Sequence, residues 1–329
     1  MWRYLLRRFL YMLFTVWVIT IISFVAIQLP PGDFVTNLVQ QMISSGGQAL
    51  TPEYEAQLRE QYGLNQPVYV QYYKWVRNII TRGDFGWSFT YRRDAKELII
   101  ERLPMTFALS FGSFILVWVI ALPIGIYSAV RQYSIGDYIF TFLGFIGLAV
   151  PSFLLALICL FVSQKYFGQA MIGLFSIEYA DAPWSWAKLL DMLKHLWIPV
   201  ILIGLGGTAG LIRTMRANLL DELNKPYVET ARSKGLPELK LLLKYPVRHA
   251  LNPFVSTIGW TLPGLVAGEV IVAIVLNLPT SGPVYYTALQ RQDSFVAAGF
   301  MLLLSVLTVI GTFVSDVLLA LLDPRIRLQ

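Results

Sequence analysis

Charged residues are scarce in this sequence, and cysteine and histidine are scarcer still. The 329 residues are 14% charged and 56% hydrophobic, whereas a soluble domain carries about 25% charged residues. A deficit of this size requires a second apolar solvent, so we expect a chain that resides in lipid. The single cysteine, Cys159, excludes a disulfide or a CxxC metal site within the chain.

Patterns that bind nucleotides or zinc are also missing from the sequence. No Gly-Lys dipeptide occurs, so the chain has no GxxxxGK(S/T) phosphate loop. His195 and His249 are the only histidines, and neither belongs to a zinc-type pattern. We therefore expect this chain itself to have no catalytic residues, no metal and no cofactor.

Long apolar runs dominate what is present. A hydrocarbon core of about 30 Å requires about 20 apolar residues in a helix. The runs near or above this length are Phe9–Leu29, Pro104–Val130, Tyr138–Gln164, Leu196–Ile212, Ala250–Leu276 and Ala298–Leu322. They predict an all-α integral membrane protein with six transmembrane helices. A secretory signal is the alternative for the first run, but that run is too long and Gln28-Leu29-Pro30-Pro31 is a poor cleavage site.

Basic residues predict the orientation of the chain. In multi-pass proteins Lys and Arg concentrate in short cytoplasmic loops, and this chain has a net charge of +6. The basic residues near the span ends are Arg3, Arg7, Arg8, Arg131, Lys225, Arg232, Lys234, Lys240, Lys244, Arg248, Arg325 and Arg327. With six spans they all lie on one side, so we expect both termini to be cytoplasmic.

The segment 30–103, after the first span, should form a small helical extracytoplasmic domain. Thr51-Pro52 suits a helix start, and Gly63 suits its end. Pro67 opens a second run with helical spacing of its apolar residues, and Gly83 ends that run. The aromatic residues of the segment either pack within the domain or contact a partner or lipid headgroups; they are Tyr69, Tyr72, Tyr73, Trp75 and Trp87.

A polar cytoplasmic loop separates the fourth and fifth spans. The predicted division of the chain is 1–29 for the N-terminus and first span, 30–103 for the external domain, and 104–329 for the core, with the loop at 217–249. Pro226 suits the first turn of a short helix in this loop, and Gly235 suits its end. Tyr227, Val228 and Ala231 would form a small apolar edge of that helix. Such a helix either fits a groove on a partner or rests on the bilayer surface.

The residues of this loop resemble a known motif. Glu229-Thr230-Ala231 followed by Gly235 resembles the EAA motif of the membrane subunits of binding-protein-dependent ABC importers. The longer string 227–237 resembles their peptide-type subfamily, which takes up oligopeptides, dipeptides, nickel and some oligosaccharides. Four further segments agree in order along the chain: Pro30-Pro31-Gly32-Asp33, Gly83-Asp84-Phe85-Gly86-Trp87-Ser88, Glu101-Arg102-Leu103-Pro104-Met105-Thr106 and Leu322-Asp323-Pro324-Arg325-Ile326-Arg327.

The resemblance implies a non-catalytic permease subunit in the inner (cytoplasmic) membrane. It implies a second homologous permease subunit, two ATPase subunits that bind ATP and Mg, and an extracytoplasmic solute-binding protein as partners, with no nucleic acid. The EAA loop would be the coupling helix that the ATPase subunits move. The coupling residues that the resemblance indicates are Tyr227, Glu229, Thr230, Ala231, Arg232 and Gly235, with Thr230 in place of the usual alanine.

Four charged residues within the spans or at their ends are candidates for the pathway or its gate. Glu269, in the fifth run, either lines the path or pairs with the partner subunit. Asp316, in the sixth run, suits a structural role in the bundle better than a gate. Arg213 and Arg216, at the cytoplasmic end of the fourth run, either snorkel to the headgroups or belong to the cytoplasmic gate.

The cargo and the transport class stay open at the level of sequence. Relatives of the peptide type place an acidic residue near Ala273 rather than at Glu269. Peptide permeases also often have a Pro-Gly-Leu-Gly pattern at the position that residues 277–283 occupy in this chain. These departures make an oligosaccharide a competitor of a peptide or a nickel complex. An ion-coupled secondary transporter is the alternative function, but it requires an internal inverted repeat that we do not find. A membrane-embedded enzyme is disfavoured because few polar groups converge within the spans.

Overall fold

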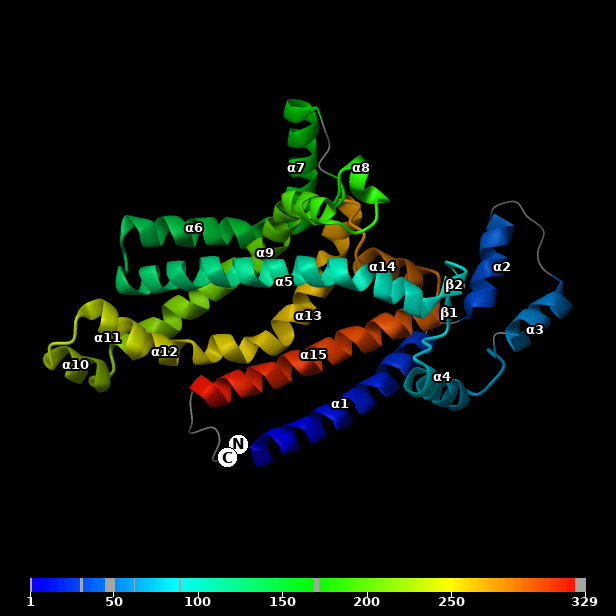
Figure 1. Ribbon diagram of the computed structural model, residues 1–329, viewed down its shortest axis with the longest axis horizontal. Helices are drawn as coiled ribbons and strands as arrows, with labels where there is room; N and C mark the ends of the chain where they lie inside the picture. The colour runs from blue at the N-terminus through cyan, green and yellow to red at the C-terminus, as the bar shows by residue number, and fades with distance from the viewer. Residues whose placement is uncertain are drawn as a thin grey trace. The chain divides into compact units, whose positions relative to one another are not determined.

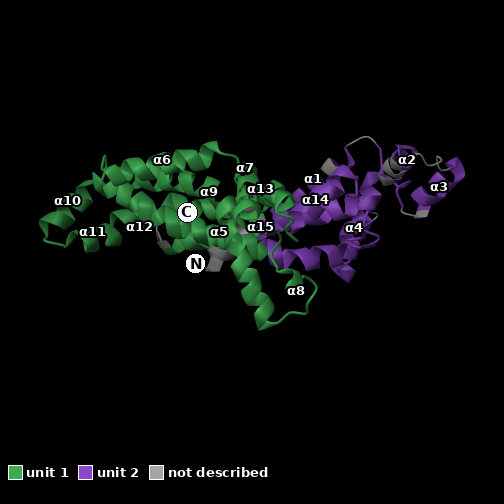
Figure 2. Ribbon diagram, turned by 90° about the horizontal axis from the view of Figure 1, so that it is seen from above, with its two compact units in different colours: residues 1–9, 107–279, 308–329 green, residues 10–106, 280–307 purple. Residues whose placement is uncertain are grey.

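The computed structural model describes residues 2–29, 32–44, 51–61, 63–88, 90–168 and 172–322 of the chain. The chain forms two compact units (Figure 2). Unit 1 consists of Met1–Phe9, Phe107–Pro279 and Thr308–Gln329, and unit 2 consists of Leu10–Thr106 and Thr280–Leu307. Unit 2 therefore groups the predicted external domain with a distant segment of the chain, which the sequence did not indicate.

Both units are built mainly from helices (Figure 1). Unit 1 contains α6 (Ile135–Ala149), α7 (Ser152–Phe167), α8 (Ile177–Ala180), α9 (Trp186–Leu223), α10 (Pro226–Ser233), α11 (Glu238–Lys244), α12 (Pro246–Ala250) and α13 (Asn252–Val275). Unit 2 contains α2 (Phe34–Ser44), α3 (Pro52–Gln61), α4 (Val68–Arg82), α14 (Ser281–Gln290) and an antiparallel hairpin of β1 (Trp87–Ser88) and β2 (Arg93–Asp94). Helices α1 (Trp2–Gln28), α5 (Ala95–Val130) and α15 (Ser294–Leu322) contribute residues to both units.

The helical membrane architecture predicted from the sequence is confirmed. Helices α1, α5, α9 and α15 are each long and apolar enough to cross a membrane, and α6 with α7 qualifies as a bent pair. The described residues thus contain four candidate spans, or up to five with that pair, by length and composition. Helix α13 covers most of the predicted fifth run, and the total of six spans stays a prediction.

The predicted third span, Tyr138–Gln164, is wrong as a single helix. Helix α6 ends at Ala149, α7 begins at Ser152, and the two are bent by 95°. Pro151 explains the break, because proline lacks a backbone N–H and disfavours helical geometry at the residue before it. Val150 accordingly adopts an extended backbone, with φ −91° and ψ 119°.

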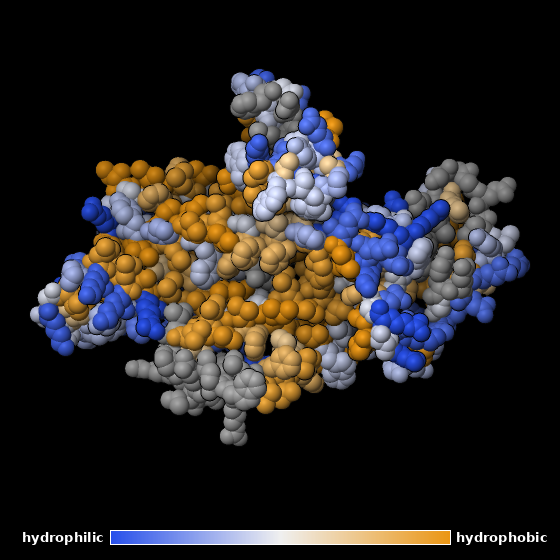
Figure 3. Space-filling model, in the orientation of Figure 1, coloured by the Kyte–Doolittle hydropathy of each residue, from blue (hydrophilic) through white to orange (hydrophobic). Residues whose placement is uncertain are grey.

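Large apolar side chains cover the outside of the long helices of unit 1. Phe142 on α6 is 65% exposed, and Val119 on α5 is 64% exposed. Figure 3 shows hydrophobic residues over α5 and α6 and hydrophilic residues over α10 and α11. Soluble monomers rarely expose apolar patches of this extent, so we assign this surface to lipid.

Helix α9 is central to unit 1. It packs against α6, α7, α12 and α13. Met215 and Leu219 of α9 are fully buried, in one cluster with Ala129 of α5 and Phe254 of α13. The approach of α5 depends on Gly125, because a Cβ added there would lie 2.6 Å from the Cβ of Met215.

The aromatic residues of the predicted external domain divide into a packed and an exposed group. Trp75 is buried beside Phe24 and Tyr72, and its Nε1 donates a hydrogen bond to the carbonyl of Phe85 at 2.9 Å. Packing within unit 2 therefore accounts for Tyr72 and Trp75. The exposed members are Tyr69, Tyr73 and Trp87.

Helices α3 and α4 begin and end where the sequence predicts. Pro52 is the first residue of α3, and Pro67 directly precedes α4. Gly63 and Gly83 follow them with φ of +67° and +62°. This left-handed backbone is the one that glycine adopts at little cost after a helix.

Asp33 connects two helices of unit 2. Its Oδ1 accepts hydrogen bonds at 2.8 Å from the backbone N–H and from the hydroxyl of Thr36, in the first turn of α2. Its Oδ2 accepts a hydrogen bond at 2.9 Å from Nε of Arg59 on α3. Burial alone would raise the pKa of Asp33, but the hydrogen bonds from Thr36 and Arg59 outweigh burial and hold that pKa below its usual value. The ionised carboxylate is therefore the form that stabilises this contact.

We expect the stability of α2 to depend on pH through Asp33. Because the folded-state pKa lies below the ordinary 3.8, the stabilisation is complete above that value and is lost as the pH falls through the folded pKa. Hydrogen–deuterium exchange of Phe34–Ser44, corrected for intrinsic rates, should accelerate in acid. Asp33→Asn should exchange faster at neutral pH and lose the acid dependence, and an unaltered dependence in this variant would contradict the assignment.

Asp293 fixes the β1–β2 hairpin to the start of α15 within unit 2. The side chain is fully buried, and its Oδ2 accepts hydrogen bonds from Oγ of Ser88 at 2.7 Å and from the backbone N–H of Thr90 at 3.0 Å. Burial raises the pKa of Asp293, and the hydrogen bonds from Thr90 and Ser88 offset only part of that effect. Segments 205 residues apart in sequence are thereby held together.

Asp293→Ala should destabilise the protein because it leaves the buried hydroxyl of Ser88 and the half-buried backbone N–H of Thr90 without their acceptor. We expect a loss of about 1–3 kcal/mol in the free energy of unfolding, measured by denaturation of the purified protein in detergent. Asp293→Asn keeps an acceptor oxygen and removes the buried charge, so its loss should be smaller. Equal losses in the two variants would rule out the acceptor role.

Candidate functional site

The predicted coupling helix is present as α10. Pro226 is its first residue, where the missing N–H of proline removes no helical hydrogen bond. After the helix, Gly235 has φ +75°, and its N–H donates to the carbonyl of Arg232 at 3.0 Å. Both boundaries thus follow from the proline and the glycine that the sequence singled out.

The inner face of α10 packs on α11. Val228 is fully buried, and Ala231 is 7% exposed, against Leu241 of α11. Tyr227 packs on the edge of this cluster. The predicted apolar edge of the helix is therefore buried inside the loop itself, because short helices are marginal unless they bury their apolar sides against other parts of the protein.

Glu222, at the end of α9, anchors α10. It accepts a short hydrogen bond from the hydroxyl of Tyr227 and an ion-paired hydrogen bond from Nζ of Lys225 at 2.6 Å. The Tyr227 ring also meets the His249 ring edge to face, with centroids 5.7 Å apart. Burial and the Glu222 carboxylate raise the pKa of Tyr227. Tyr227 is therefore a positioning residue and keeps its proton.

The outer face of α10 is exposed and polar. Glu229, Thr230, Arg232 and Gly235 are all exposed. Arg232 forms a two-point ion pair with Glu238, at 2.6 Å and 3.3 Å, which raises the pKa of Arg232. The candidate coupling residues thus separate into this exposed set and two inner residues, Ala231 and Tyr227, which act through packing and positioning.

The two arginines near the end of α9 have different surroundings. Arg216 forms a two-point ion pair with Asp137 of α6, with atom separations of 3.1 Å and 2.9 Å. Arg213 is exposed, with its guanidinium 5.8 Å from the centre of the Phe145 ring. The sequence reasoning missed Asp137, although Ser134 three residues before it shows the spacing of a helix start. Ser134 Oγ does accept a hydrogen bond from the backbone N–H of Asp137 at 3.3 Å.

Arg216→Ala should strongly destabilise unit 1. The Asp137 side chain is 4% exposed, and a buried carboxylate left without its partner costs about 3–5 kcal/mol. Thermal unfolding of the purified protein in nanodiscs measures the loss. Arg213→Ala is the matched control on the same helix, and its effect should stay below about 1 kcal/mol; a comparable loss in both variants would contradict the importance of the ion pair.

The remaining charged candidates lie on other helices. Glu269 of α13 is fully buried. Asp316 of α15 forms an ion pair with Arg8 of α1 at 3.2 Å within unit 1. The described residues contain no group of three or more His, Cys, Asp or Glu side chains placed to hold a metal. Pro30, Pro31 and residues 323–329, which carry part of the resemblance, lie outside the described residues.

Comparison with known proteins identifies the family. The model of the binding-protein-dependent transport system inner membrane component matches residues 121–328, and the model of its N-terminal region matches residues 1–110. An oligopeptide transport system permease protein of Bacillus subtilis is 36% identical over 325 residues, which are 98% of this chain and 99% of that protein. A dipeptide transport system permease protein of Escherichia coli is 28% identical over 355 residues, covering 99% of each chain.

A solved structure supports the fold independently. A chain of the MetNI methionine ABC transporter in an inward-facing conformation aligns with a TM-score of 0.50 at 18% identity, covering 69% of this chain and 96% of that chain. At this identity the alignment speaks for the fold alone. The family matches confirm the resemblance found in the sequence: the chain belongs to the family of binding-protein-dependent transport system inner membrane components, the permease subunits of ABC importers.

Proposed function

We propose that this chain and a second homologous permease subunit form the translocation path of an importer for short peptides. An extracytoplasmic solute-binding protein delivers the peptide, and two ATPase subunits bind ATP and Mg and contact α10. The full-length similarity to oligopeptide and dipeptide permeases supports this cargo class. The same relatives give no support to an oligosaccharide cargo or to an ion-coupled secondary transporter, so neither is proposed.

The arrangement of α10 carries the proposal. The helix is held from behind by buried Val228 and Ala231 and is tied to α9 through Glu222. Its polar face, with Glu229, is left exposed. A helix that is rigidly mounted and presents its polar side outward is suited to transmit a displacement from a partner protein to α9. This role requires α10 to be cytoplasmic, and with six spans both termini are then cytoplasmic as well.

The charged candidates take different roles in this proposal. Arg216 and Asp316 are engaged in ion pairs, which favours structural roles for them over gating. Glu269 remains the candidate for the path, because a fully buried carboxylate in an apolar helix must face polar groups or water. Arg213, which is exposed near the cytoplasmic end of α9, remains a candidate for the gate.

Glu229→Arg tests the coupling role. We expect the reconstituted importer to lose most of its peptide-stimulated ATP hydrolysis and peptide uptake, because reversing the charge disrupts a polar contact with the ATPase subunit. Glu229 is exposed, so folding of the permease should be preserved. Uptake of a labelled tripeptide into proteoliposomes and co-purification of the ATPase subunits are the measurements.

Glu53→Arg is the control for the charge reversal. Glu53 is also an exposed helical glutamate, but it lies on α3 in the predicted external domain. The Glu53→Arg variant should leave ATP hydrolysis and peptide uptake unchanged. If Glu229→Arg retains normal assembly and transport, α10 is not the coupling helix.

A further inference from the structure

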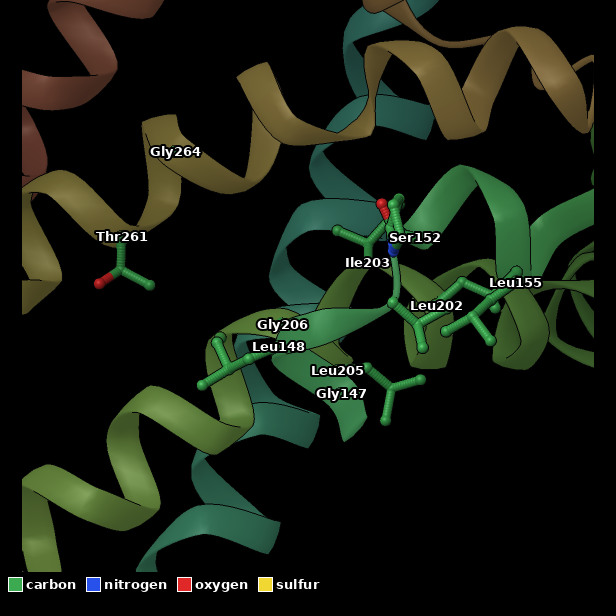
Figure 4. Close-up of a pocket in the computed structure, with 13 residues that line it drawn as sticks. Gly147, Leu148, Ser152, Leu155, Leu202, Ile203, Leu205, Gly206, Thr261 and Gly264 are labelled. Atoms are coloured by element: carbon green, nitrogen blue, oxygen red, sulfur yellow. The ribbon is translucent and has the colours of Figure 1, made fainter. Parts of the chain in front are cut away.

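A cavity of 420 Å³ lies in unit 1 beside the break between α6 and α7 (Figure 4). Its wall comes from the break with the adjoining ends of α6 and α7, from α9 and from α13. None of these lining residues is charged, and the only side-chain polar groups are the hydroxyls of Ser152 and Thr261. Pockets that hold small molecules have volumes of about 300–1,000 Å³, mostly apolar walls and a few polar groups. The cavity has these properties.

Some glycines that line the cavity are not needed for helix packing. Gly204 of α9 is a packing glycine, since an added Cβ would lie 3.2 Å from Cγ2 of Val117. At Gly206 and Gly264, which line the cavity, an added Cβ meets no atom within 4 Å. Neither has the left-handed φ that would favour glycine. Both glycines are exposed and line the cavity, so a side chain at either position has room beside it, and glycine leaves that space open.

The broken helix at the cavity favours a group of the cargo, rather than a lipid chain, as its occupant. Val150, Pro151 and Ser152 of the break all line the cavity. Irregular backbone at membrane depth is tolerated only where it is buried in protein or lines a cavity, not where it faces lipid. Discontinuous helices commonly form the substrate sites of transporters, where their free backbone groups face the substrate. A peptide offers partners for such groups, and an acyl chain offers none.

We propose that this cavity binds an apolar side chain of the transported peptide. The assignment rests on the proposed peptide-import function and specifies which part of the cargo this chain contacts. The uncharged wall suits a side chain such as Leu or Phe and is unfavourable for the charged peptide termini. The Thr261 hydroxyl donates to the carbonyl of Thr257 at 2.8 Å. This internal hydrogen bond satisfies the donor of the hydroxyl, so Thr261 adds little polarity to the wall.

Filling the cavity tests the proposal in the complete importer with its binding protein and ATPase subunits. Gly206→Leu places an isobutyl group in the cavity, and Gly210→Leu is the matched control. Gly210 lies on the same helix, a Cβ there also meets no atom within 4 Å, and it does not line the cavity. The probes are the tripeptides Ala-Phe-Ala and Ala-Ala-Ala, and the binding protein's affinity for each is measured separately.

We expect Gly206→Leu to lower the uptake of Ala-Phe-Ala about tenfold relative to that of Ala-Ala-Ala, the scale on which an apolar pocket discriminates. Gly210→Leu should leave the ratio of the two uptake rates unchanged. If Gly206→Leu fails to assemble, Gly206→Ala with Ala-Trp-Ala as the larger probe gives the same comparison. The same ratio in wild type and in the cavity variant would overturn the cavity assignment, as would an equal loss for both peptides. Failure of the wild-type importer to move either peptide would instead overturn the proposed function.

Discussion

Unit 1 is organised around one constraint: α9 is a single helix of 38 residues. At its end Glu222 holds Tyr227 and Lys225 of the coupling loop, and 16 residues earlier Gly206 lines the cavity. At about 1.5 Å per residue these positions are about 24 Å apart. In the proposed coupling, a displacement of α10 would reach the cavity through the hydrogen-bonded backbone of α9, which is much stiffer than a chain of side-chain contacts. The fully buried side chains of Met215 and Leu219 pack α9 against its neighbouring helices.

Two ion pairs separate the structural charges from the candidate functional ones. Asp137 with Arg216 connects α6 to α9, and Arg8 with Asp316 connects α1 to α15 within unit 1. A charge in or near a hydrocarbon environment is costly unless it is paired, and pairing restricts how the helices can move apart. Glu229 differs because it is exposed on a mounted helix. Exposure leaves it available to a partner at little cost in stability.

The glycines of α9 show how one residue type serves two purposes on the same helix. Gly204 allows close packing on α5, because an added Cβ would crowd Val117. Gly206, two residues on, lines the cavity, and an added Cβ there meets no atom within 4 Å. Small residues in membrane helices are usually explained by helix association. That explanation applies to Gly204 but not to Gly206, which is consistent with the proposed binding of a cargo side chain in the cavity.

The sequence by itself determined the helical membrane class, the family, and the boundaries of α10, because apolar length, proline and glycine act locally. It also predicted the ends of α3 and α4 for the same reason. Tertiary structure alone decided that Val228 and Ala231 face α11, that Asp137 pairs with Arg216, and that the third apolar run breaks at Pro151 beside a cavity. Proline is tolerated inside α9 at Pro199, so a proline does not by itself say whether a helix will break. These outcomes depend on contacts between residues that are far apart in the sequence, and a local sequence pattern does not specify such contacts.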